Sequence, residues 1–252
     1  MQCYTEWCKI QSESKYQYVK ELWPRFAIMP SITKEVRILL EKEVLLEWRH
    51  KYAVNGVLLY TFATIFICYM SFEVQRGGLN AFAWNAIFWI IMLFSAVSAI
   101  SKSFVQESTA RQMYYFNLVR PISIILSKII YNTCFLILLS LVAFLVFSLI
   151  LGSPVQDQGM FAMVVVLGAI GFSTVLTLMS GIASKTENNG MLMAVLSFPV
   201  VIPLIMMIIK ISKNAIDGID RGESMDEILT LLAIDAIVGV LALMLFPYLW
   251  RS

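Results

Sequence analysis

Six long apolar runs fill almost the whole chain after Ala53, and they limit its fold more than any other feature. A hydrocarbon core of roughly 30 Å takes about 20 helical residues to cross, and only helices and closed barrels satisfy their backbone there. Because the runs are continuous rather than alternating, we expect an all-α, polytopic membrane protein with six transmembrane helices. The expected spans are about Val54–Phe72, Phe82–Ser101, Ile122–Leu151, Met160–Ala183, Met191–Ile211 and Ile228–Trp250.

The placement of Lys and Arg residues predicts how the chain lies in the membrane, since cytoplasmic loops carry an excess of them. With the N-terminus inside, the inner side holds ten basic residues and the outer side only four, three of which lie in an acidic stretch. We therefore expect both termini in the cytoplasm. The inner residues are Lys34, Arg37, Lys42, Arg49, Lys51, Lys102, Arg111, Arg120, Lys185 and Arg251, and the outer ones are Arg76, Lys210, Lys213 and Arg221.

Two segments precede the first span. Residues 1–30 are polar and aromatic without periodicity, which predicts a weakly ordered tail and makes Met29 a candidate start of the protein. Residues 31–51 repeat apolar side chains at steps of three and four, which predicts an amphipathic helix. Such an elbow helix either lies flat on the inner leaflet or packs against its own domain. We expect residues 31–252 to form one membrane domain.

The stretch Lys102–Pro121 is polar and lies between the second and third spans. Glu107 and Arg111, four residues apart, fall on one helical face, whereas Tyr114 and Tyr115 fall near the membrane surface. The stretch is either a solvated interfacial helix or a docking helix for a cytoplasmic motor. It ends at Arg120-Pro121, and Lys128 in the following span is expected to reach the inner headgroups.

The chain has no set of residues for catalysis or for nucleotide binding. It contains no Gly-Lys dipeptide and therefore no P-loop, and its single histidine, His50, is expected to contact lipid headgroups. Its four cysteines form no C-x-x-C pair, so neither a disulfide framework nor a zinc site is indicated. We expect a protein that is not an enzyme and binds no cofactor or metal directly. If nucleotide drives it, another subunit binds the nucleotide.

Polar and helix-breaking residues also occur inside the predicted spans. Asp235 is expected to face the bundle interior, because a bare carboxylate near mid-bilayer costs roughly 2.5–3.5 kcal/mol. It serves either in hydrogen-bonded packing or in a proton relay. Pro199 and Pro203 each remove a backbone donor, so the fifth span is expected to be kinked. Asn85 and Asn132 are expected to hydrogen-bond across helices.

Several motifs resemble those of ABC-2-type exporter permeases. These have an elbow helix, six spans, and a first inner loop with an acidic residue, a proline and then a lysine, matched here by Glu107, Pro121 and Lys128. Ser108-Thr109 replaces the usual Gly-Thr. Within this group the chain is most similar to the CcmB family over about Thr33–Arg251. The supporting runs are E-W-R-H-K-Y-A-V-N-G (Glu47–Gly56), F-V-Q-E-S (Phe104–Ser108), L-V-R-P-I-S-I-I-L-S-K (Leu118–Lys128) and S-F-P-V-V-I-P in the fifth span.

The resemblance implies a permease subunit in the bacterial inner membrane that delivers haem for cytochrome c maturation. Its implied partners are a separate cytoplasmic ABC ATPase that binds ATP, a haem-handling membrane protein and a haem chaperone, with no nucleic acid. The resemblance also places Glu107, Arg111, Tyr114, Tyr115, Arg120, Pro121 and Lys128 in an ATPase-coupling loop. Two alternatives remain open: an ABC-2 permease that exports a lipid, glycan or drug, and a proton-coupled carrier or intramembrane enzyme that uses Asp235.

Overall fold

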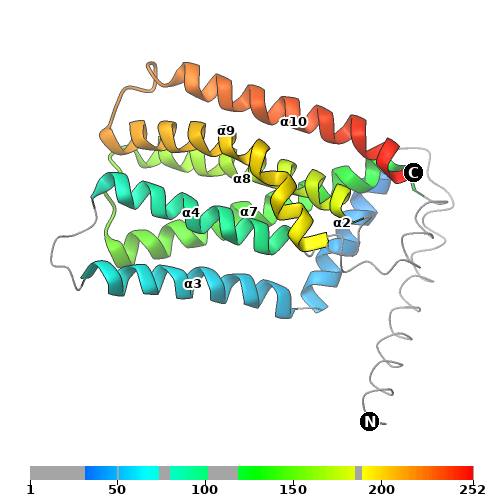
Figure 1. Ribbon diagram of the computed structural model, residues 1–252, viewed down its shortest axis with the longest axis horizontal. Helices are drawn as coiled ribbons and strands as arrows, with labels where there is room; N and C mark the ends of the chain where they lie inside the picture. The colour runs from blue at the N-terminus through cyan, green and yellow to red at the C-terminus, as the bar shows by residue number, and fades with distance from the viewer. Residues whose placement is uncertain (1–31, 50, 74–79, 102–118, 185–188, 252) are drawn as a thin grey trace, which may run out of the picture.

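The computed structural model describes residues 32–49, 51–73, 80–101, 119–184 and 189–251, and within these ranges the regular structure is entirely α-helical. Figure 1 shows long helices lying side by side, with α2 at the end of the bundle near the C-terminus, here called the α2 end. The end of α3, the start of α4 and the connections α7–α8 and α9–α10 lie at the opposite end, here called the far end. The helices are α2 (Ile32–Arg49), α3 (Lys51–Glu73), α4 (Ala81–Ile100), α7 (Pro121–Leu151), α8 (Gln158–Ala183), α9 (Asn189–Asp217) and α10 (Met225–Arg251).

Six of these helices are long and apolar enough to cross a membrane, which confirms the predicted number of candidate spans. Their apolar segments begin and end within a few residues of the predicted bounds except in the fifth. The segments are Val54–Phe72, Ala81–Ile100, Pro121–Leu151, Gln158–Ala183, Met191–Asp217 and Met225–Tyr248. The predicted tail, residues 1–30, lies outside the described residues.

The segment after the fifth span differs from the prediction. The spans predicted at Met191–Ile211 and Ile228–Trp250 leave Ser212–Glu227 as an acidic connection between them. Instead α9 continues to Asp217, and only residues 218–224 separate it from α10. The hydroxyl of Ser212 bonds back to the carbonyl of Ile208 at 2.6 Å, and Ala215 and Ile216 are buried. The polar residues of this segment do not end the helix, because their side chains are hydrogen-bonded within it or to a neighbouring helix.

Helix α8 is the centre of the bundle. In its most apolar segment 72% of the residues are buried, against 17% in α3. Glycines allow the neighbours to come this close: a Cβ atom at Gly168 would lie 2.9 Å from the indole ring of Trp89. Small residues thus allow close packing on the most buried of the six candidate spans.

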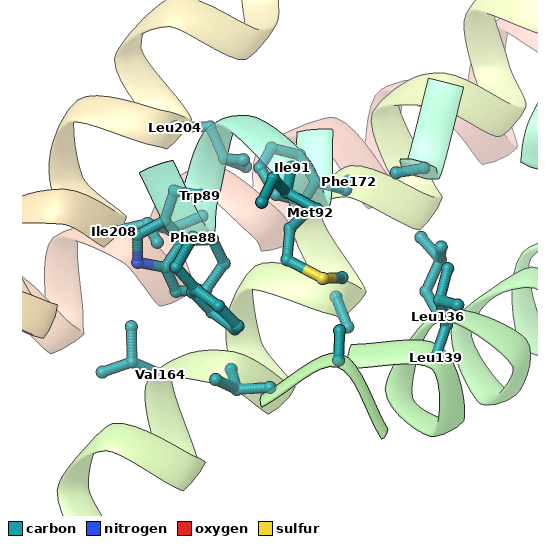
Figure 2. Packing of buried hydrophobic residues seen from close by; sticks show 14 of the residues in the cluster. Phe88, Trp89, Ile91, Met92, Leu136, Leu139, Val164, Phe172, Leu204 and Ile208 are labelled. Carbon is teal, nitrogen blue, oxygen red and sulfur yellow. The ribbon is translucent and has the colours of Figure 1, made fainter. Parts of the chain in front are cut away.

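Aromatic side chains fill the bundle between α4, α7 and α8. The rings of Trp84, Phe88, Phe144, Phe147 and Phe161 lie with centroids 4.9 to 6.4 Å apart, distances at which aromatic pairs attract. Figure 2 shows the adjoining core, in which Trp89 of α4 lies beside Ile208 of α9.

Both indole N–H groups of this core have acceptors. Trp84 donates to the carbonyl of Gly152 at 2.8 Å, and Trp89 donates to the hydroxyl of Ser212 at 2.8 Å. Because buried polar groups are costly without partners, these bonds fix the depth of α4 against the ends of α7 and α9.

The predicted interhelical amide bonds are confirmed. Asn132 of α7 donates to the hydroxyl of Thr177 in α8 at 2.8 Å, and Asn85 of α4 donates to the carbonyl of Ile209 in α9 at 3.0 Å. Helix α9 contains Pro199 and Pro203 in its interior, and Figure 1 shows that its N-terminal part bends away from the rest of the helix. The two missing N–H donors give a physical reason for such a bend.

The far end is closed by a network around Asp157. Its Oδ1 accepts from the N–H of Met160 at 2.9 Å and so caps α8, while Arg221 binds both carboxylate oxygens at 2.8 and 2.9 Å. The Arg221 hydrogen bond, followed by the Met160 N–H, lowers the pKa of Asp157 to about 2. The backbone N–H of Asp157 also donates to Ala215 at 3.0 Å. The start of α8 is thereby fastened to the α9–α10 connection.

Candidate functional site: the junction of α2 with α7

The best-defined polar site at the α2 end is where α2 meets the first turns of α7. We call it the α2–α7 junction and define it by Glu35, Glu43, Arg120, Ser123 and Lys128. Helix α7 begins here because Arg120 adopts an extended N-cap conformation and Pro121 takes the first helical position, where a missing N–H has no cost. The junction therefore starts directly after residues 102–118, which lie outside the described residues.

Glu35 makes the first polar contact of the junction. Its side chain is 6% exposed, and its Oε2 accepts a hydrogen bond from the hydroxyl of Ser123 at 2.6 Å. The Nε of Arg120 lies 3.9 Å from the other oxygen, although Arg120 itself is largely exposed. A hydrogen bond to a charged acceptor is roughly twice as strong as a neutral one, so Glu35 is fastened mainly by Ser123.

Glu43 makes the second contact, two helical turns further along α2. Its Oε1 lies 3.2 Å from the ammonium of Lys128 and 3.2 Å from that of Lys42. The prediction that Lys128 reaches the headgroups is wrong, because the side chain is 1% exposed and points into the junction. The ammonium group of Lys128 bonds to the carboxylate of Glu43 inside the junction instead of extending to the headgroups.

Apolar side chains pack beneath these polar contacts. Leu39 of α2 lies in one cluster with Val119, Ile124 and Ile125 of the α7 entry and with Phe246 of α10. Leu39 is 2% exposed and Ile125 fully buried. Glu35, Leu39 and Glu43 follow one another at steps of four residues and so form one stripe along α2. The buried face of α2 also includes Val36 and Ile38, which lie beside this stripe.

The apolar residues of the predicted elbow helix differ in how far they are buried. Val36 and Leu39 are buried, whereas Val44 is 51% exposed. The structure therefore contains the helix and packs one stripe of it on its own domain. Its amphipathic position flat on the inner leaflet stays a prediction.

Of the seven residues predicted for the coupling loop, three belong to the junction region. Arg120, Pro121 and Lys128 lie at the start of α7, whereas Glu107, Arg111, Tyr114 and Tyr115 lie outside the described residues. Sequence reasoning missed Glu35, Glu43 and Ser123. The available signal was the stripe of two acidic residues flanking a leucine, since acidic residues within an apolar face need a basic or hydroxyl partner.

Asp235 lies elsewhere, in α10, and faces α8 and α9. Its side chain is 8% exposed, and it lies over Gly171 of α8 next to Leu204 of α9. The hydrogen-bonded packing expected for it is not found, because neither carboxyl oxygen has a hydrogen-bond partner within the described residues. Those residues also contain no group of three or more His, Cys, Asp or Glu side chains that could hold a metal ion.

Comparison with known proteins agrees with this architecture. A search of curated proteins gave no match. A protein-family model described as CcmB protein matches residues 34–248, a range that includes the α2–α7 junction and all six candidate spans. The chain therefore belongs to the CcmB family, a permease-type family of ABC-transporter membrane proteins associated with cytochrome c biogenesis.

Proposed function

We propose that this chain is the permease subunit of an ABC transporter complex that exports or delivers haem for cytochrome c maturation. In this proposal a separate ATPase binds ATP, and the permease passes the resulting movement to a haem-handling membrane partner or a haem-loaded chaperone. Family membership supports the class of transporter. The α2–α7 junction supports the coupling role and is the observation on which that role depends.

The junction gives residues 102–118 a route into the membrane domain. Val119, Arg120 and Pro121 follow those residues along the chain, so a force on them acts first on the start of α7. Two polar contacts, Ser123 to Glu35 at 2.6 Å and Lys128 to Glu43 at 3.2 Å, then connect α7 with α2. A movement that begins in the loop is in this way shared by two helices.

The proposed location is the bacterial inner membrane, with the α2 end and both termini in the cytoplasm. The described basic residues of α2 and of the α7 entry support this orientation under the positive-inside rule. Among the described residues the far end carries fewer basic side chains, namely Lys210, Lys213 and Arg221. An ATPase would then reach the junction from the cytoplasmic side.

The coupling role can be tested with two glutamates on the same helix. Glu43→Gln removes the charge that meets Lys128, whereas the matched control Glu41→Gln removes an exposed partner of Arg37. In the complete complex we expect Glu43→Gln to retain the ATPase but to release less haem-loaded chaperone per ATP hydrolysed, with Glu41→Gln unchanged. Equal coupling in the two variants would count against the junction as a transmission element.

Two further measurements test the docking of the ATPase and the identity of the transported ligand separately. Glu107→Gln and Arg111→Gln should weaken co-purification of the ATPase if residues 102–121 form the docking loop. Deleting the gene should abolish covalent haem attachment to c-type cytochromes. Normal cytochrome c assembly in that strain would contradict haem delivery and favour the alternatives, of which export of a lipid, glycan or drug is the one that keeps the ABC-2 class.

A further inference from the structure

Asp235 lies in the third turn of α10 and faces α8 and α9. A Cβ atom at position 171 would lie 2.5 Å from Oδ1 of Asp235 and 2.5 Å from Cδ1 of Leu204. The carboxyl group and the leucine methyl therefore fill the space that a side chain on α8 would need. A side chain at residue 171 would therefore require Asp235 and Leu204 to move.

This carboxyl group has no polar partner in its surroundings. It is 8% exposed, and both oxygens lack a hydrogen-bond partner within the part of the chain that the structure describes. An ionised carboxylate in such a place would lose its hydration and gain no compensating contact, which costs several kcal/mol. The neutral acid avoids most of that cost.

The ionisable groups on neighbouring helices do not change this conclusion. Helix α8, Gln158–Ala183, contains none. Helix α9 contributes Lys210, Lys213 and Asp217, and α7 contributes Lys128, Tyr131 and Cys134. The others on α10 are Asp226, Glu227, Tyr248 and Arg251.

The nearest of these along α10 is already paired. Glu227 lies eight residues from Asp235, roughly 12 Å along a helix, and binds Lys210 at 3.0 Å. Lys128 binds Glu43 at the other end of the bundle. Lys213 is exposed, and no cation in the described structure bonds to either oxygen of Asp235.

We propose that Asp235 is a proton-binding site whose occupancy is linked to the packing of α10 against α8 and α9. While the helices are packed, the carboxyl group is neutral. When the contact opens and water enters, the O–H bond breaks, its electron pair stays on the carboxylate, and the proton passes to water. Loss of the proton then opposes repacking until one is bound again. This proposal does not depend on the identity of the transported ligand.

Infrared spectroscopy of the full-length chain in lipid nanodiscs tests the protonation state directly. The chain has five aspartates, and the other four are Asp157, Asp217, Asp220 and Asp226. Three of these are exposed and Asp157 is bound to Arg221. With 13C-labelled aspartate, we expect a label-sensitive carbonyl band of a protonated acid at neutral pH, lost in Asp235→Asn and retained in the matched control Asp226→Asn.

Labelled wild-type protein decides the matter even where Asp235→Asn does not fold. A wild-type spectrum at neutral pH with carboxylate bands alone from the labelled aspartates would overturn the proposal. So would an acid band that persists in Asp235→Asn.

Glycine variants test the link to helix packing. Gly171→Ala forces the carboxyl group away from α8, whereas Gly239→Ala, one turn further along α10, meets no atom within 4 Å. We expect the acid band to disappear at neutral pH in Gly171→Ala and to remain in Gly239→Ala. If Gly171→Ala keeps the band over the whole pH range in which wild-type protein shows it, the link to packing is refuted.

Discussion

Replacing Ser123 by alanine should destabilise the chain far more than the same change one turn later. Ser123 donates its hydroxyl to Glu35 on a different helix at 2.6 Å. Ser127 is equally buried, but its hydroxyl bonds to the carbonyl of Ile124 within α7 at 2.8 Å. The two substitutions remove the same atom from neighbouring turns of one helix, so their difference isolates the contact between α2 and α7.

The expected magnitudes follow from the acceptors. A hydrogen bond to a charged group contributes about 1.5–3 kcal/mol. Within the described residues, Ser123→Ala leaves the carboxylate of Glu35, 6% exposed, with the Arg120 Nε at 3.9 Å as its remaining polar neighbour. Ser127→Ala removes a local bond to the carbonyl of Ile124, which keeps its partner within the helix. Alanine also has a higher helix propensity than serine. We therefore expect a change within about 0.5 kcal/mol. The expected difference is roughly 1–3 kcal/mol.

Reversible unfolding in mixed micelles of increasing SDS content measures this difference. The double-mutant cycle of Glu35→Gln with Ser123→Ala should give a coupling energy of at least about 1 kcal/mol, because each single change disrupts the same contact. If Ser123→Ala and Ser127→Ala unfold at the same SDS fraction, the argument that Ser123 fastens α2 to α7 is refuted.

Three further predictions concern the rest of the bundle. The Arg221 contact lowers the pKa of Asp157 to about 2, so the stabilisation from this contact is present above about pH 4 and is lost as the pH falls toward 2. The thermal midpoints of wild type and Asp157→Asn should therefore converge over that interval. A constant difference between the two midpoints would contradict this. Trp84→Phe keeps the ring contacts but loses a 2.8 Å hydrogen bond, which should cost about 0.5–1.5 kcal/mol in SDS unfolding. Phe147→Ala empties a fully buried site and should cost about 3–5 kcal/mol, whereas Leu149→Ala, 78% exposed, should cost less than 1 kcal/mol by the same assay.

The spans could be predicted from sequence because membrane-spanning helices are set by length and apolarity, both of which are local properties. The end of α9 could not, since Ser212 is satisfied by the carbonyl of Ile208 and by the indole of Trp89. One of these partners is 123 residues away in the chain. A polar run in the sequence therefore did not mark the end of the helix.

The junction was only half predictable for the same reason. The sequence singled out Lys128 but assigned it to the headgroups, since nothing local reveals that Glu43, 85 residues earlier, lies 3.2 Å away. For Asp235 the location could be predicted, but the surroundings could not. Its place in the interior follows from the cost of a buried charge, but the lack of any partner is visible only once α8 and α9 are in place.

The arrangement of the two polar contacts gives the proposed transmission of movement through the junction a physical basis. Glu35 and Glu43 are eight residues apart on α2, roughly 12 Å, whereas Ser123 and Lys128 are five apart on α7, roughly 7.5 Å. A single contact would allow α2 to swivel about it, but two separated contacts fix both its direction and its position along α7. The apolar packing of Leu39 lies between them. A displacement of the α7 entry must therefore carry α2 with it or break a buried polar contact.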